Sequence, residues 1–182
     1  MEAEKILREI EEISKNEFLP IIGPLKGQVL VEAITERKPR KILEIGTLVG
    51  YSALLMALHM PKNAKITAIE KSEGLVKIAK RNIKKAGLSK RIEVVQGDAR
   101  KVIPSLSGKF DFVFIDAEKS EYLDYLRLAE PKMSKSCVVV ADNVKIFKNT
   151  MDDYLNHVRN PKNYKSKTYD VGFDAVEVSV KK

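Results

Sequence analysis

Along most of the chain, segments with two different patterns of apolar and polar positions follow one another in turn. Short continuous apolar runs, typical of strands buried on both faces, occur at 41–45, 64–70, 91–96, 110–116 and 136–142. The segments between these runs have apolar residues at helical spacing and predict helices at 50–60, 72–87, 99–106 and 120–130. One more helix is indicated around 149–159, and two further strands are indicated at 164–171 and 174–182.

Strand–helix units in sequence predict an α/β fold. They form a mostly parallel sheet with right-handed connections and helices on both faces. The last two strands, joined by Gly172 and Phe173, are expected to pair antiparallel at the edge. Because no linker or low-complexity tract interrupts the chain, we predict one domain over 1–182. Two amphipathic helices at 1–38 would precede a core at 41–182.

An acidic residue stands at the end of each of the five predicted parallel strands. These residues are Glu44, Glu70, Asp98, Asp116 and Asp142, with Asn143 after the last. In open α/β sheets, ligands bind beyond the carboxyl ends of the strands. A rim of carboxylates is a poor site for phosphates and suits a ligand that carries positive charge and hydroxyl groups.

The turn after the first strand favours a nucleoside cofactor. Gly46 and Gly50 are separated by three residues, which is not the G-x-G-x-x-G spacing of dinucleotide-binding folds. Glu70 follows Gly46 by 24 positions, where a carboxylate can accept both hydrogen bonds of a ribose diol. S-adenosylmethionine fits this rim because it has a sulfonium, an ammonium and a ribose but no phosphate. The plain alternative is an ordinary tight strand–helix turn.

Several segments together resemble one known family. They are GPLKGQVL (23–30), LEIGTLVGYSALLMA (43–57), AIEKSEGLVKIAKRNIKKAGL (68–88), VVQGDARKVIPSL (94–106), FDFVFIDAEKSEYLDYL (110–126) and VVVADNV (138–144). These segments resemble the metal-dependent O-methyltransferases, the family that includes catechol and caffeoyl-CoA O-methyltransferases. The resemblance covers roughly residues 20–182. It implies a Rossmann-like class I methyltransferase fold with seven strands, mostly parallel, and an antiparallel terminal strand.

The resemblance also implies roles for individual residues. The methionine and sulfonium end of the cofactor would be lined by Ile22, Gly46, Thr47, Gly50, Tyr51 and Ser52. Glu44 would face the positive groups, and Glu70 would hold the ribose. Asp98 and Ala99 would border the adenine, while Asp116 and Ala117 would lie beside the cofactor. A Mg²⁺-type ion would be bound by Asp116, Asp142 and Asn143, and the catalytic residues would be Lys119 as general base and Asp116.

The chemistry of these residues agrees with the implied reaction. Carboxylate and amide oxygens are hard ligands that suit Mg²⁺. A bound metal ion lowers the pKa of a coordinated hydroxyl, and Lys119 stands three positions after Asp116, close enough to take the proton. We therefore predict O-methylation of a catechol-like or vicinal-diol small molecule. For Asp142 and Asn143 the alternative is a simple turn cap after a strand.

The distribution of charge leaves a second acceptor open. The chain carries a formal net charge of +8, and residues 71–91 hold eight Lys or Arg against one acidic residue. This segment is either the solvated face of an amphipathic helix or a patch for RNA or another polyanion. The patch reading keeps open the same chemistry on a hydroxylated tRNA nucleoside. A cofactor-binding module without catalysis is a further alternative, and a redox enzyme fits less well without the dinucleotide fingerprint.

Location and assembly follow from simpler features. The chain has one cysteine, Cys137, and no apolar stretch of about 18 residues that could cross a membrane. The charged, periodic N-terminus is unlike a signal peptide. We therefore expect a cytoplasmic protein with no membrane partner. The first helix is expected to pack on the domain or on a second subunit of a homodimer.

Overall fold

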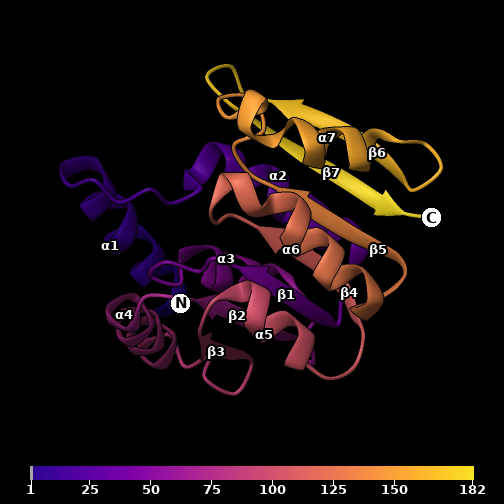
Figure 1. Cartoon of the computed structure of the whole chain (residues 1–182). Helices are drawn as coiled ribbons and strands as arrows, with labels where there is room; N and C mark the ends of the chain where they lie inside the picture. The colour runs from indigo at the N-terminus through magenta and orange to yellow at the C-terminus, as the bar shows by residue number, and fades with distance from the viewer. Residues whose placement is uncertain (1) are drawn as a thin grey trace.

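The computed structural model describes residues 2–182 and contains a central sheet covered by helices (Figure 1). The strands are β1 (Lys41–Ile45), β2 (Lys65–Glu70), β3 (Ile92–Gln96), β4 (Phe110–Ile115), β5 (Met133–Ala141), β6 (Tyr164–Asp170) and β7 (Ala175–Lys181). The α-helices are α1 (Glu2–Asn16), α2 (Gly23–Arg37), α3 (Tyr51–His59), α4 (Glu73–Lys85), α5 (Ala99–Ser105), α6 (Tyr122–Ala129) and α7 (Asp152–Arg159). Short 3₁₀ turns are η1 (Lys119–Glu121), η2 (Glu130–Lys132) and η3 (Lys148–Met151).

The sheet has seven strands in the order β3-β2-β1-β4-β5-β7-β6. Strands β1 to β5 pair in parallel, whereas β7 is antiparallel to both β5 and β6. The chain builds outward from β1 to β3 and then returns to add β4 beside β1. The order therefore reverses between β1 and β4, which is where ligands bind in open α/β sheets. The predicted Rossmann-like fold with an antiparallel terminal strand is confirmed.

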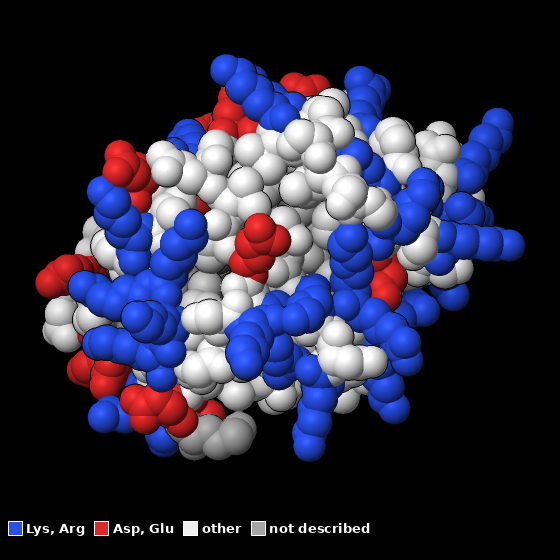
Figure 2. Space-filling model, turned by 90° about the horizontal axis from the view of Figure 1, so that it is seen from below, with Lys and Arg blue, Asp and Glu red and all other residues white. Residues whose placement is uncertain are grey.

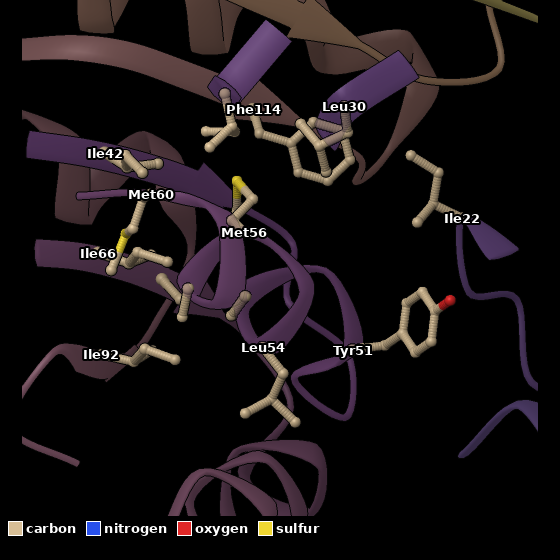
Figure 3. Packing of buried hydrophobic residues seen from close by; sticks show 14 of the residues in the cluster. Ile22, Leu30, Ile42, Tyr51, Leu54, Met56, Met60, Ile66, Ile92 and Phe114 are labelled. Atoms are coloured by element: carbon tan, nitrogen blue, oxygen red, sulfur yellow. The ribbon is translucent and has the colours of Figure 1, made fainter. Parts of the chain in front are cut away.

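Two hydrophobic clusters cover the two faces of the sheet. One cluster joins alternate strand residues to helices α1 to α4, and the other joins the remaining strand residues to α5, α6 and α7. Figure 3 shows part of the first cluster, where Ile42, Ile66 and Ile92 of three neighbouring strands lie on the same side as Leu54 and Met56 of α3. Burial on both faces explains why the central strands read as continuous apolar runs.

Most strand ends lie within one residue of the sequence-based prediction, but the beginning of one strand differs by more. Strand β5 begins at Met133 rather than at 136. Ser134 is half-buried, while Lys135 and Ser136 are exposed, and Ser136 has φ 60°. The pairing with β4 shifts in register between Phe110 and Phe112. This irregular, polar beginning lacks the apolar run that marks the rest of the strand, so the pattern did not reveal it.

Among residues 2–182, no helix is both long enough and apolar enough to cross a membrane.

Candidate cofactor and metal site

The turn after β1 is pressed against the end of β4. Gly46 has φ 84°, a conformation that favours glycine. A Cβ atom at this position would collide with the backbone carbonyl oxygen of Asp116. The Asp116 N–H donates to the Ile45 carbonyl at 2.9 Å, which fixes the two strand ends side by side. Two of the predicted site residues are thus neighbours because Gly46 has no side chain.

Glu70, at the end of β2, contacts the turn that follows β1. Its Oε2 accepts a hydrogen bond from the Leu48 N–H at 3.1 Å, and its Oε1 accepts one from the Ser72 N–H at 2.9 Å. Only 9% of Glu70 is exposed. Each carboxylate oxygen has two lone pairs. One acceptor position on each oxygen therefore remains for the two hydroxyls of a ribose.

Glu44 and Thr47 place unpaired polar atoms beneath the same turn. Glu44 is fully buried, and its Oε1 accepts a hydrogen bond from the Ser52 hydroxyl. Within the described chain, Glu44 Oε2 and Thr47 Oγ1 have no hydrogen-bond partner. Burial raises the pKa of Glu44 to about 7. A buried carboxylate that lacks a counter-charge suits a cationic ligand, so these residues fit the positive end of the cofactor.

Lys119 and Tyr122 connect the ends of β4 and β5. The Lys119 ammonium donates to Asp116 Oδ1 at 2.8 Å and to the Tyr122 hydroxyl at 3.0 Å. The Tyr122 hydroxyl donates to the Asp142 carbonyl oxygen at 3.3 Å. The side chains of Lys119 and Asp116 are 16% and 17% exposed, so both can be reached from solvent.

Asp142 belongs to a buried network that the sequence did not predict. The Lys26 ammonium donates to Asp142 Oδ2 and to Asp174 Oδ2, each at 2.8 Å. Asn143 donates from its backbone N–H to Asp142 Oδ1 and from Nδ2 to Asp174 Oδ2, both at 2.8 Å. Asn143 has φ 64°, a left-handed conformation that asparagine tolerates better than most residues. With its Nδ2 directed at Asp174, the Asn143 Oδ1 is left as an oxygen donor for a metal.

The pKa values of the charged groups in this network are shifted in different directions. Burial opposes the charge on Lys26, but Asp142 and Asp174 outweigh it and raise the pKa of the lysine. Burial also opposes the charge on Asp174, yet its hydrogen bonds from Lys26, Ala175 and Asn143 lower its pKa. For Asp142, burial and then the neighbouring Asp116 charge raise the pKa to about 7. Asp142 is therefore the carboxylate with too little positive charge around it.

A divalent cation fits this balance. Asp116, Asp142 and Asp174 supply three carboxylates, whereas Lys26 and Lys119 supply only two ammonium groups. Among residues 2–182, no three His, Cys, Asp or Glu side chains form a metal-binding group. A metal here would depend on two carboxylates and the Asn143 amide oxygen, with water or substrate oxygens filling the other positions, as Mg²⁺ prefers.

The outer members of the predicted cofactor site make other contacts. Asp98 caps α5 by accepting from the Arg100 N–H at 2.9 Å, and the Arg100 side chain lowers the pKa of Asp98 to about 2. Ala99 is buried in the cluster under α5. The Tyr51 hydroxyl donates to Glu11 of α1 at 2.6 Å. Ile22 is buried in the same hydrophobic cluster as Tyr51. Gly50 has φ 87° and directly precedes α3. A Cβ atom at Gly46 would contact Ala117.

Lys26 is the main residue that the sequence reasoning missed, although a signal was present. It occupies the same helical stripe as Val29, Leu30 and Ala33, all of which are buried. A lysine on an apolar stripe needs a buried partner of opposite charge. The partner, Asp174, is 148 positions away, so local pattern could not identify it.

The fold is that of a class I methyltransferase. The family model described as O-methyltransferase matches residues 1–162, and the chain belongs to this S-adenosylmethionine-dependent O-methyltransferase family. It is 35% identical over 127 residues to a catechol O-methyltransferase of Niastella koreensis, covering 68% of this chain and 58% of the relative. It is 33% identical over 127 residues to a caffeoyl-CoA O-methyltransferase of Stellaria longipes, covering 65% and 53%.

A solved structure agrees over nearly the whole chain. An O-methyltransferase from Bacillus cereus in complex with SAH superposes with a TM-score of 0.87 at 26% identity, covering 98% of this chain and 91% of that one. The chain spans a little over half the length of the two curated relatives.

Proposed function

We propose that the protein transfers the methyl group of S-adenosylmethionine to a hydroxyl of a catechol-like or vicinal-diol small molecule, with Mg²⁺ bound by Asp116, Asp142 and Asn143. The observation that carries this proposal is the strand-end network, in which three carboxylates share two ammonium groups. When bound, the metal ion would supply Lewis acidity that makes an acceptor hydroxyl easier to deprotonate.

The cofactor would be held by the turn after β1 and by Glu70. Glu70 has acceptor positions left for the ribose diol, and Glu44 offers a buried carboxylate oxygen toward positive charge. Gly46 allows the backbone of the turn to lie against Asp116. The cofactor and the acceptor would then be bound on either side of Asp116, an arrangement that brings the methyl group and the hydroxyl together and lowers the barrier by orientation.

Lys119 is the side chain we propose accepts the hydroxyl proton. Its Nζ is held between Asp116 Oδ1 and the Tyr122 hydroxyl, at 2.8 and 3.0 Å. These contacts fix the side-chain nitrogen beside a proposed metal ligand, where an activated hydroxyl would lie. To accept the hydroxyl proton, the ammonium must first release a proton to solvent, and the positive charges of a bound metal ion and of the sulfonium would favour that neutral amine. Proton removal by a positioned base typically contributes about 10²- to 10⁴-fold to the rate.

Exposed apolar side chains next to the site favour an aromatic acceptor. Leu25, Ile146, Phe147 and Phe173 are all exposed, and each lies within four positions of Lys26, Asn143 or Asp174 in the chain. The Lys119 ammonium lies 5.9 Å from the centre of the Phe147 ring. The Ile146 N–H donates to Asp174 at 3.3 Å. Apolar walls around a few polar groups are typical of small-molecule sites, so we prefer a diphenol to a nucleoside.

The acceptor panel tests this proposal. The protein should be incubated with labelled S-adenosylmethionine and Mg²⁺ in three separate reactions. One contains simple diphenols, one a caffeoyl-type thioester and one total tRNA. We expect label on a diphenol or on the thioester. Label on tRNA alone would replace this acceptor by the hydroxylated nucleoside. Failure of S-adenosylmethionine to bind would contradict the cofactor assignment itself. The homodimer, the single domain and the cytoplasmic location remain predictions.

A further inference from the structure

A hollow lies at the opposite ends of the strands from the candidate site. It has a volume of about 820 Å³. Its cationic lining residues are Lys41, Lys65, Lys80, Lys84, Lys90 and Arg91, which we call the basic groove. Lys41 and Lys65 are the first residues of β1 and β2, and Arg91 directly precedes β3. The candidate site is at the carboxyl ends of the strands, so the basic groove is a separate surface.

No carboxylate of the described residues neutralises the positive charge of the basic groove. Glu93 is the one acidic residue in the lining. Within residues 2–182, none of the six cations forms an ion pair with a carboxylate. Lys41 instead donates to the Ser107 carbonyl at 2.7 Å, and Arg91 donates to the Pro61 carbonyl at 2.9 Å. Like charges gathered in this way repel one another, and an anionic ligand would relieve that repulsion.

The positive surface extends beyond the hollow. Helix α4 continues it with Arg81 and Lys85, whereas Lys77 is ion-paired with Glu73, and the face below β3 and α4 shows groups of Lys and Arg side chains with few acidic ones between them (Figure 2). A single small anion would leave most of these charges unpaired. A long polyanion can contact them together.

The chemistry of the lining indicates what kind of polyanion fits. Its apolar members are buried, as are Ile83 and Ile92, or half-buried, as is Leu106, so none offers an exposed side chain to insert into a membrane. Its aromatic residue, Phe110, is only 1% exposed and cannot stack on a base. We propose that the basic groove binds the sugar–phosphate backbone of a nucleic acid, without reading its sequence. RNA and DNA share this chemistry. The bound nucleic acid need not be the methyl acceptor, since the groove is at the far end of the sheet.

Fluorescence anisotropy tests the proposal without cofactor or metal. A labelled single-stranded RNA of about 20 nucleotides and a duplex DNA of similar length should bind, with log K falling linearly as log salt rises. Each phosphate contact contributes a slope of about −0.7 for single strands and about −0.9 for duplex DNA. The relative affinities of the two probes distinguish RNA from DNA.

A charge-matched pair of variants locates the binding surface. Lys80→Glu/Lys84→Glu reverses two exposed groove lysines, and Lys5→Glu/Lys165→Glu reverses two exposed lysines elsewhere. We expect the groove variant to lose at least about tenfold in affinity and to show a shallower salt slope, while the control keeps most of its binding. Both variants should give the wild-type circular dichroism spectrum, which shows that the fold is intact.

Three results would overturn the proposal. They are equal loss of affinity in the two variants, no binding of either nucleic acid at about 50 mM salt, or binding to anionic phospholipid vesicles in place of nucleic acid. Because none of these measurements requires methyl transfer, they do not depend on the outcome of the acceptor panel.

Discussion

The Lys26 ammonium lies 2.8 Å from Asp142 Oδ2, although 116 positions separate the two residues in the chain. The same ammonium lies 2.8 Å from Asp174 Oδ2. The Lys26 side chain is 6% exposed and those of the two aspartates are 2% or less, so water screens these charges weakly. One buried cation therefore serves two carboxylates, and the site can accept a second cation.

Replacing Lys26 by Met should make the fold depend on a divalent cation. The change leaves two buried carboxylates without their ammonium, which typically destabilises a protein by about 3–5 kcal/mol. Mg²⁺ should then restore part of the lost stability, because it supplies the missing charge and binds only the folded state. The measurement is urea unfolding of wild type and variant, with EDTA and with Mg²⁺.

The double variant Lys26→Met/Asp174→Asn is the matched control. It removes one carboxylate together with the lysine, so we expect it to be more stable than Lys26→Met alone. If Lys26→Met were as stable as wild type and indifferent to Mg²⁺, the proposed charge balance of the site would be wrong.

Glu70→Ala should weaken cofactor binding. Hydrogen bonds to a charged acceptor contribute about 1.5–3 kcal/mol, which corresponds to roughly 10- to 150-fold in affinity. Titration calorimetry with S-adenosylmethionine measures this change. Glu73→Ala removes the same charge three positions later from an exposed side chain, and its affinity should match wild type. Equal affinities in all three proteins would remove Glu70 from the ribose site.

Glu44 should make stability depend on pH. Burial raises its pKa in the folded state to about 7, from a usual value of 4.5. The folded protein therefore binds more protons than the unfolded chain between these two values, and its stability falls as pH rises through this range. Each pKa unit corresponds to about 1.4 kcal/mol, so the total effect is about 3 kcal/mol.

The variant Glu44→Gln isolates this effect because it keeps the shape of the side chain and cannot ionise. Denaturant unfolding between about pH 4.5 and 8 should show wild type losing stability relative to the variant until about pH 7, and no further relative change above it. A constant difference across the range would show that folding does not raise the pKa of Glu44.

Lys119→Arg should lose the chemical step and retain binding. Arginine keeps the positive charge beside Asp116 but cannot act as a base in this pH range. We expect kcat to fall by about 10²- to 10⁴-fold, while the affinity for S-adenosylmethionine stays within about twofold. Lys145→Arg changes a lysine that is ion-paired with Asp170 on the surface, and its kcat should be unchanged. A wild-type rate in Lys119→Arg would assign the base to another group.

The local pattern of apolar and polar residues was sufficient to predict most of the fold. The apolar runs predicted the parallel strands because those strands are buried on both faces, and the acidic residues at their ends predicted the rim of the site. The irregular beginning of β5 escaped because Lys135 and Ser136 are polar and exposed. The antiparallel pairing of β7 followed from the short turn at Gly172.

Long-range contacts could not be predicted in the same way. The bond between Tyr51 and Glu11, which ties α1 to α3, joins two residues 40 positions apart. The pairing of Lys26 with Asp174 depends on β7 lying beside β5, where helix α2 meets the strand ends. Local periodicity shows that a charged residue is buried, but the topology decides which opposite charge it meets.

Metal removal and restoration tests the proposed reaction most directly. Methyl transfer to the diphenol identified by the acceptor panel should stop when EDTA is present and return on adding excess Mg²⁺. Asp142→Asn should still bind S-adenosylmethionine. Its rate of methyl transfer should be low from the start, so that neither EDTA nor added Mg²⁺ changes it. Turnover that continues at the wild-type rate in EDTA, or that is undiminished in Asp142→Asn, would contradict a metal-assisted O-methyl transfer at this site.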